Sequence, residues 1–223
     1  MKALLIPIKE PTRAKTRLAN LLTLDERQLL VWAMFADVCK AVAASRKAEH
    51  IFIVTNFQKA AEQARSFGWN VLLEEAQESE SASIDWASRL ICKRGYDAVM
   101  RLPADVPLLQ AKDIDELLAI ELNAPNALLV PSREGTGTNA IIRTPGDLFP
   151  SRFGPNSLAL HKQEAAQAGV ECLIVHNERI ALDIDEPQDL ETFLAFGKDT
   201  QAFRLLVEMN IAERLSLFNE FKL

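Results

Sequence analysis

The chain has 223 residues and a mass of 24.9 kDa, and 48% of its residues are hydrophobic, which fits one globular domain with a substantial core. Its net charge of -6 argues against a general nucleic-acid binder, which needs an excess of Lys and Arg to neutralise phosphates. No apolar run has the length of a membrane span. Because Cys39, Cys92 and Cys172 share no disulfide or metal spacing, we expect the reducing cytoplasm as the compartment.

Strand-like apolar runs alternate with helical patterns over the first 131 residues. The first helix is expected to begin near Thr23, because Thr23 and Glu26 form a capping-box pattern. The alternation predicts a parallel α/β sheet. The expected strands are 2–8, 50–55, 70–73, 97–102 and 126–131, and the further helices are 57–67, 82–93 and 112–122.

The pattern changes after residue 131. Strands are predicted at 138–143, 171–175 and 179–183, with a Gly/Pro-rich loop at 144–156 and a helix at 157–168; an antiparallel pair is expected among these later strands. From Pro187 onward the sequence predicts helices. We expect residues 1–196 to form the main domain, and residues 197–223 to form a helical extension that packs on this domain or on a dimer partner.

Two acidic motifs each follow a strand-like run. In an open α/β sheet, ligands bind at the carboxyl ends of the strands, which is where these motifs would lie. Asp105 lies between Pro103 and Pro107, which fix the direction of the chain on both sides. Asp183 and Asp185, two apart on a predicted strand, would point the same way and repel unless a cation joins them. The carboxylate oxygens of these three aspartates are ligands of the kind that Mg²⁺ prefers. The alternatives are that Asp105 is an ordinary turn residue and that Asp185 caps the helix beginning near Pro187.

The loop after the first strand is basic. It carries Lys9, Arg13, Lys15 and Arg17 with one acid, which predicts an anion site, although a solvated basic loop is the alternative. It contains neither a GxGxxG nor a GxxxxGK[ST] motif, so a dinucleotide fingerprint and a P-loop are not supported.

A third group of residues is rich in glycine. Four of the eight glycines lie between residues 135 and 154, just before a helix predicted to start at Ser157. Glycine permits close backbone approach, and the N–H groups at a helix start attract anions. A ligand carboxylate or phosphate fits such a place, and a plain hairpin turn with Ser157 as a cap is the alternative.

The three histidines, His50, His161 and His176, lie far apart in the sequence and form no HExxH pattern. No GxSxG elbow or reactive-cysteine context is present, so nothing supports a hydrolytic triad.

Taken together, these residues resemble the 2-phospho-L-lactate guanylyltransferase family, relatives of the molybdenum-cofactor guanylyltransferase type that act in coenzyme F-420 biosynthesis. The resemblance covers residues 1–196. Five motifs carry it in the same order: Pro7-Ile-Lys9 with Lys15-Thr-Arg17-Leu18, Leu102-Pro-Ala-Asp105-Val-Pro107-Leu, Gly135-Thr-Gly-Thr-Asn-Ala140, Phe153-Gly-Pro-Asn-Ser157 and Leu182-Asp-Ile-Asp185.

The resemblance implies an α/β fold with a Rossmann-like mixed, mostly parallel sheet and helices on both faces. It implies transfer of GMP from GTP to phosphoenolpyruvate, 2-phospho-L-lactate or 3-phospho-D-glycerate with release of pyrophosphate. Composition adds the expectation of a monomer or homodimer with no nucleic-acid or membrane partner. The roles it implies are Mg²⁺ ligands at Asp105, Asp183 and Asp185; acceptor binding by Thr138, Gly154 and Ser157; and binding of the GTP phosphates by the loop that carries Lys15 and Arg17. We expect catalysis by Asp105, Lys15 and Arg17. From the charge and position of the same loop, we expect Lys9, Arg13 and Lys15 to bind GTP.

One segment departs from the family. The family often has a Gly-Leu-Asn-like segment near the nucleobase, whereas this chain has residues 80–86, Glu-Ser-Ala-Ser-Ile-Asp-Trp. We hypothesise that Asp85 accepts hydrogen bonds from guanine. Another nucleotidyltransferase, of the molybdopterin or sugar-phosphate type, and a noncatalytic nucleotide-binding protein stay open as alternatives.

Overall fold

The computed structural model describes residues 1–76, 78–121 and 123–220. Within them the strands form one seven-stranded sheet in the order β3-β2-β1-β4-β6-β5-β7. Strand β6 runs antiparallel to β4 and β5, and the other neighbours are parallel. The change of direction after residue 131 was expected, but β6 pairs with the earlier strands β4 and β5 and not with another of the later strands. The strands are β1 Lys2–Pro7, β2 Ile51–Thr55, β3 Asn70–Leu73, β4 Ala98–Arg101, β5 Asn126–Pro131, β6 Thr138–Thr144 and β7 Cys172–Ile174.

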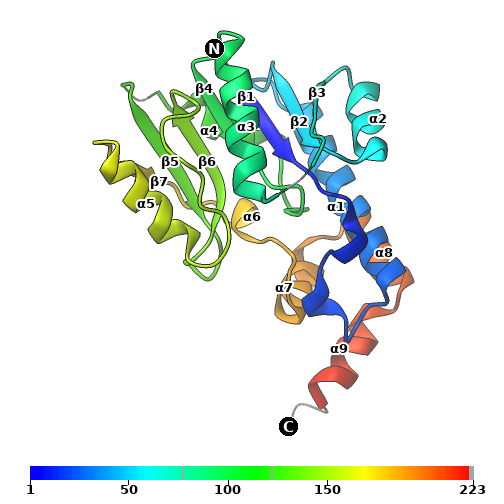
Figure 1. Ribbon diagram of the computed structural model, residues 1–223. Coiled ribbons are helices and arrows are strands. Elements are labelled where there is room, and N and C mark those ends of the chain that lie inside the picture. Colours follow the sequence, from blue (N-terminus) through cyan, green and yellow to red (C-terminus); the bar gives the residue numbers. More distant parts are fainter. Residues whose placement is uncertain (77, 122, 221–223) are drawn as a thin grey trace.

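Helices cover both faces of the sheet, as Figure 1 shows, which confirms the predicted mixed α/β architecture. Helices α1, α2 and α4 pack on one face, and α3 and α5 pack on the other. The helices are α1 Leu24–Ala44, α2 Gln58–Ser66, α3 Glu80–Lys93, α4 Ala111–Ala119, α5 Ser157–Gln167, α6 Glu178–Ala181, α7 Pro187–Phe196, α8 Gln201–Glu208 and α9 Ile211–Glu220, with short 3₁₀ turns at Pro11–Arg13 and Thr16–Leu18.

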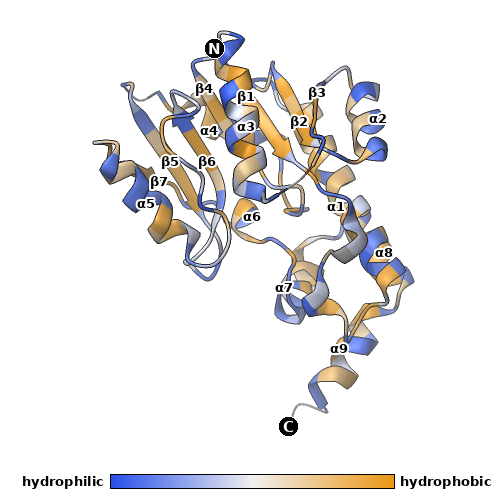
Figure 2. Ribbon diagram, viewed as in Figure 1, coloured by the Kyte–Doolittle hydropathy of each residue, from blue (hydrophilic) through white to orange (hydrophobic). Residues whose placement is uncertain are grey.

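The central strands are apolar on both faces, as a sheet covered by two helical layers requires. Along β1, Leu4 and Ile6 pack toward α1, whereas Ala3 and Leu5 pack toward α3. Figure 2 shows the hydrophobic strands in the middle of the molecule. This continuous burial fixes the strand ends in space, and with them the loops that carry polar side chains.

Helix α1 begins as the sequence predicts. Thr23 is its N-cap: the Glu26 N–H donates to the Thr23 hydroxyl (3.3 Å), and the Thr23 N–H donates to the Glu26 carboxylate (2.8 Å). Although α1 is 21 residues long, none of the described helices combines the length and the apolarity that a membrane crossing needs.

The prediction of a strand at residues 179–183 is wrong. Residues Glu178–Ala181 form the short helix α6, because the Asn177 side chain accepts hydrogen bonds from the N–H groups of Arg179 (3.1 Å) and Ile180 (3.0 Å). The Arg179 guanidinium also binds the buried carboxylate of Asp113 through two nitrogens, which holds the turn against α4. Capping and ion pairing therefore override the β-like composition of this segment.

The C-terminal helices pack on the same chain. Helices α7, α8 and α9 share a second apolar cluster with α1 and the turn that contains Leu18. Two polar contacts fix them: the buried Asp37 carboxylate accepts from the N–H groups of Gln201 (2.7 Å) and Ala202 (2.9 Å), and Arg214 binds Glu26 through both terminal nitrogens. These contacts join α8 and α9 to the beginning of the domain.

Candidate active site

The two acidic motifs meet beyond the end of β4. The Ile184 N–H donates to the backbone oxygen of Asp105 (3.3 Å), which lays the second motif beside the first. Carboxylate oxygens of Asp105, Asp183 and Asp185 then lie within 4.8 Å of one another. The sequence predicted that Asp183 and Asp185 lie on a strand. They lie instead on the extended connection between α6 and α7.

A lysine lies between two of these three carboxylates. Nζ of Lys15 lies 2.5 Å from the Asp105 carboxylate and 2.6 Å from that of Asp185, and only 7% of the Lys15 side chain is exposed. Lys15 adopts a left-handed backbone conformation (φ 52°), which is uncommon for a residue other than glycine. Burial opposes the charge, but attraction to Asp105 and Asp185 outweighs it and holds the pKa of Lys15 above its ordinary value. The sequence did not predict this contact.

Asp183 is held by Asn139, the second residue of β6. The Asn139 amide donates to the Asp183 carboxylate (2.9 Å) and to the backbone oxygens of Ile180 (2.9 Å) and Ala181 (3.0 Å). Burial, followed by repulsion from Asp105, raises the pKa of Asp183 to about 7, against the opposing effect of the Asn139 hydrogen bond. A cation bound among these carboxylates would reverse this repulsion.

Helix α7 is capped by its own residues. Glu186 is the N-cap, and the Asp189 carboxylate accepts from the N–H groups of Asp185 (3.1 Å) and Glu186 (2.8 Å). The alternative in which Asp185 caps this helix is therefore wrong, and its carboxylate is directed at Lys15 instead.

The opposite wall is made by the glycine-rich loops. The Thr138 N–H donates to the Ser157 hydroxyl (2.8 Å), and Thr138 Oγ1 lies 3.0 Å from Nδ1 of His161. Because the Arg152 N–H donates to Nε2 of His161 (2.8 Å), the imidazole is neutral and Nδ1 donates to Thr138. Burial, then the charges of nearby arginines, lowers the pKa of His161 to about 4. Gly154 has φ +120°, a conformation that side chains rarely adopt.

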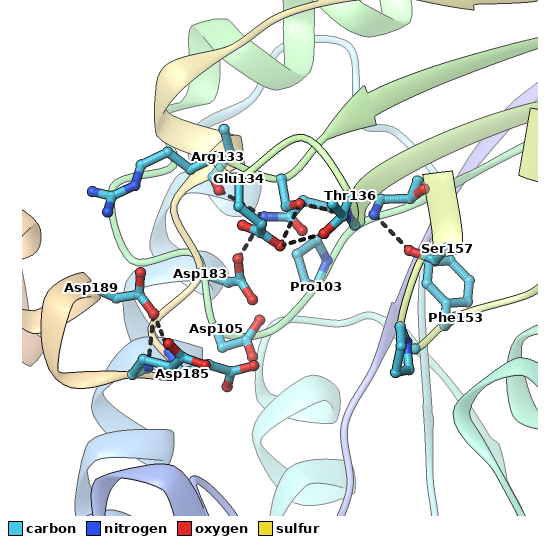
Figure 3. A pocket seen from close by; sticks show the side chains of 18 of the residues that line it. Pro103, Asp105, Arg133, Glu134, Thr136, Phe153, Ser157, Asp183, Asp185 and Asp189 are labelled. Atoms are coloured by element: carbon cyan, nitrogen blue, oxygen red, sulfur yellow. Dashed lines mark hydrogen bonds between the residues drawn. The ribbon is translucent and has the colours of Figure 1, made fainter. Parts of the chain in front are cut away.

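A cavity of about 780 Å³ separates the two walls. Figure 3 shows Asp105, Asp183 and Asp185 on one side, and Phe153 and Ser157 on the other. The predicted site residues that line it are Arg17, Asp105, Thr138, Gly154, Ser157, Asp183 and Asp185.

Of the other predicted residues, Lys9, Lys15 and Asp85 are not among those that line the cavity. Lys9 is exposed and does not line the cavity, and the Arg13 side chain lies outside the described part of the chain. The Asp85 carboxylate pairs with the buried Arg143 (3.2 Å) and accepts from the Ser151 N–H (3.0 Å). The role of Asp85 at guanine stays a prediction.

Asn139, Arg101 and Glu80 line the cavity, although the sequence did not predict them as site residues. Asn139 lies inside a motif whose function was assigned to its neighbour Thr138. Arg101 ends the otherwise apolar β4, Ala-Val-Met-Arg, and all four of these residues are buried. A charge at the end of a fully buried strand was the available signal, because a buried arginine needs a partner.

The sequence model of the family described as "Guanylyl transferase CofC like" matches residues 1–218. The chain belongs to this family. The match confirms the family that the motifs indicated, and it extends across α7 and α8 into α9.

Named relatives of similar length support the assignment. The chain is 31% identical over 192 residues to a phosphoenolpyruvate guanylyltransferase of Rubrobacter xylanophilus (86% of this chain, 93% of the relative). It is 30% identical over 188 residues to a 3-phospho-D-glycerate guanylyltransferase of Colwellia psychrerythraea (84% and 89%). It is 29% identical over 212 residues to a 2-phospho-L-lactate guanylyltransferase of Methanothermobacter thermautotrophicus (95% and 92%).

Solved structures share the fold. A protein of Desulfovibrio desulfuricans, provisionally classed as a nucleotide-diphospho-sugar transferase, superposes with a TM-score of 0.78 at 18% identity, covering 96% of this chain and 97% of that one. CMP:2-keto-3-deoxy-manno-octonic acid synthetase in complex with CTP gives 0.58 at 13% identity, covering 89% and 98%. The sheet is thus of the nucleotide-diphospho-sugar transferase type, and family membership makes the chain a nucleotidyltransferase.

Proposed function

We propose that the protein transfers GMP from GTP to the phosphate of a three-carbon phospho-acid and releases pyrophosphate, as a step of coenzyme F-420 biosynthesis. The acceptors considered are the phospho-acids in the names of its relatives. One observation carries the proposal: three carboxylates converge on one wall of a cavity whose other wall is a glycine-rich loop and the start of a helix. Such a cavity can hold a metal-bound phosphate at one end and an anionic group at the other.

The carboxylates fit Mg²⁺. Asp105, Asp183 and Asp185 offer hard oxygen ligands within 4.8 Å of one another, and the Lys15 ammonium already bridges two of them, which shows that the cluster accommodates a positive charge. Bound there, Mg²⁺ would offset the repulsion between the phosphates of the two substrates.

The chemistry needs little from side chains beyond position and charge. A phosphate oxygen of the acceptor attacks the α-phosphorus of GTP; a new P–O bond forms, the bond to the β-phosphate bridging oxygen breaks, and pyrophosphate leaves. A phosphate monoester has a second pKa of about 6, so the attacking oxygen is already largely ionised at neutral pH. This agrees with His161, which contacts the cavity residue Thr138, being buried and bonded at both nitrogens.

We assign different residues to the two substrates, GTP and the acceptor. Lys15 and Arg17 are proposed to bind the GTP phosphates, together with Lys9 and Arg13, because charge-assisted hydrogen bonds to phosphate are the strong ones. Arg17 lines the cavity and is exposed enough to exchange its partner, Glu186 (3.0 Å), for a phosphate.

The other end holds the acceptor. Thr138, Gly154 and Ser157 are proposed to meet its carboxylate. The Ser157 hydroxyl accepts from the Thr138 N–H, so its own hydrogen is available to a ligand oxygen.

A pyrophosphate-release assay tests the proposal. Purified protein with MgCl₂ is given GTP, ATP or CTP against phosphoenolpyruvate, 2-phospho-L-lactate or 3-phospho-D-glycerate, with each nucleotide alone as the control. We expect release with GTP and at least one acceptor, and loss of release in EDTA. Release that depends on CTP or ATP would assign the site to another nucleotidyltransferase, and no release with any pair would refute the function.

A further inference from the structure

The cavity is strongly acidic, which raises the question of what holds the acceptor carboxylate. Its described lining contains three arginines: Arg17, Arg101 and Arg133. It contains seven acids: Glu80, Asp105, Glu134, Asp183, Asp185, Glu186 and Asp189. A metal ion at the aspartates serves the phosphate groups, so a carboxylate at the far end needs another cation.

Arg101 differs from the other two arginines. Arg17 and Arg133 are exposed and are bonded to Glu186 and Thr192. Arg101 is only 7% exposed, and its Nε is buried without a hydrogen-bond partner. A buried N–H without an acceptor is costly, so the described part of the chain leaves one donor of this guanidinium unsatisfied.

The contacts of Arg101 place it beside the proposed acceptor end. Its Nη1 donates to the backbone oxygen of Asn139 (2.8 Å), the residue after Thr138. Its guanidinium carbon lies 4.3 Å from the ring centroid of Phe153, the residue before Gly154. The guanidinium is therefore held between the two loops that were assigned to the carboxylate.

Glu80 completes the arrangement. It is the first residue of α3, it forms an ion pair with Nη2 of Arg101, and it also lines the cavity. About a third of its side chain is exposed (35%), so the carboxylate has lone pairs that can accept a further hydrogen bond.

We propose that Arg101 binds the acceptor carboxylate and that Glu80 accepts a hydrogen bond from a hydroxyl on the neighbouring carbon, so that the site selects 3-phospho-D-glycerate. Among the three acceptors this one carries a free hydroxyl beside its carboxylate. In phosphoenolpyruvate and 2-phospho-L-lactate the oxygen at that carbon bears the phosphate. The inference rests on the proposed function and names its acceptor.

The selectivity follows from what Glu80 does to the wrong acceptor. Without a hydroxyl, the ligand offers the Glu80 carboxylate no donor beyond Arg101 and adds a second negative charge next to it. A site built to hydrogen-bond a substrate hydroxyl rejects analogues that lack it. Because Glu80 is partly exposed, water screens part of this effect, and we expect a preference of about tenfold to a hundredfold.

Steady-state kinetics test the roles of Arg101 and Glu80, with the acceptor varied at saturating GTP and GTP varied at saturating acceptor. We expect the wild type to show kcat/KM at least about tenfold higher for 3-phospho-D-glycerate than for either other acceptor. Glu80→Ala is expected to remove most of this preference. Arg101→Lys keeps the positive charge but loses the planar guanidinium, which can bind a carboxylate through two nitrogens. It is expected to raise the acceptor KM about tenfold or more with the GTP KM unchanged. Glu78→Ala, at an exposed acid two residues away, is the matched control and is expected to keep the preference.

Three results would overturn the inference while leaving the guanylyltransferase function in place: an equal or better use of phosphoenolpyruvate or 2-phospho-L-lactate by the wild type, an unchanged preference in Glu80→Ala, or an unchanged acceptor KM in a folded Arg101→Lys. Circular dichroism checks folding. If Arg101→Lys does not fold, the wild-type preference and Glu80→Ala decide. Absence of pyrophosphate release with GTP and every acceptor would instead remove the function and this inference together.

Discussion

His161 offers a direct test of how the acceptor-side wall is held together. The imidazole is fully buried, accepts from the Arg152 N–H (2.8 Å) and contacts the Thr138 hydroxyl (3.0 Å). Protonation would put a hydrogen on the nitrogen that faces the Arg152 N–H and would bury a positive charge near other arginines. The folded protein should therefore resist protonation of this side chain.

The magnitude follows from the pKa. Folding lowers the pKa of His161 from 6.5 to about 4, so its contribution to stability is fully present above pH 6.5 and is lost as the pH falls through the unfolded value toward 4. Between about pH 7.5 and about pH 5 the unfolded chain takes up this proton and the folded chain does not. The free energy of unfolding should fall by about 2 kcal/mol on account of His161 alone.

Urea denaturation at several pH values measures this loss. The perturbation is His161→Gln, and the quantity compared is the change in unfolding free energy between the two pH values. We expect the wild type to lose about 2 kcal/mol more than the variant over this interval, because all other titrating groups are shared. His176→Gln, at an exposed histidine, controls for the loss of a histidine as such. Equal losses in the wild type and His161→Gln would refute the burial of a neutral imidazole.

Three further predictions concern the site and the fold around it. Asp105→Asn, and separately Asp183→Asn, should lower turnover by orders of magnitude with an unchanged circular dichroism spectrum, whereas the exposed Asp199→Asn should not; near-normal rates would contradict the metal assignment. Ser157→Ala should raise the acceptor KM, and a change confined to the GTP KM would contradict its placement. Asp37→Ala leaves two N–H groups of α8 without acceptors and should lower the urea-measured stability by about 2 to 4 kcal/mol; an unchanged midpoint would show that α8 does not depend on this contact.

Local patterns in the sequence predicted much of the fold. The capping box at Thr23 and the period of the apolar residues depend on neighbours in the chain, so they identify α1 and the early strands without knowledge of the rest. The segment 179–183 shows where this reasoning fails. Its helix depends on Asn177 and on the distant Asp113, a partner that local composition does not reveal.

In the candidate site, too, the sequence indicated the residues and the tertiary structure decided their contacts. The sequence indicated Asp105, Asp183 and Asp185 as a group, because acidic residues after strand-like runs and the order of the motifs are visible in one dimension. The tertiary structure decided how the group is held: Asn139 positions Asp183, and Lys15 lies between Asp105 and Asp185.

What the sequence by itself determined is the class of the molecule: an α/β nucleotidyltransferase with three metal-suited aspartates, a basic loop and a glycine-rich loop. What only the tertiary structure decided is which charges meet. The pairing of Arg101 with Glu80, and of Asp85 with Arg143, joins residues far apart along the chain. The physical reason is that secondary structure follows from short-range periodicity, whereas the strength of an ion pair depends on distance and burial that exist only once the sheet has assembled.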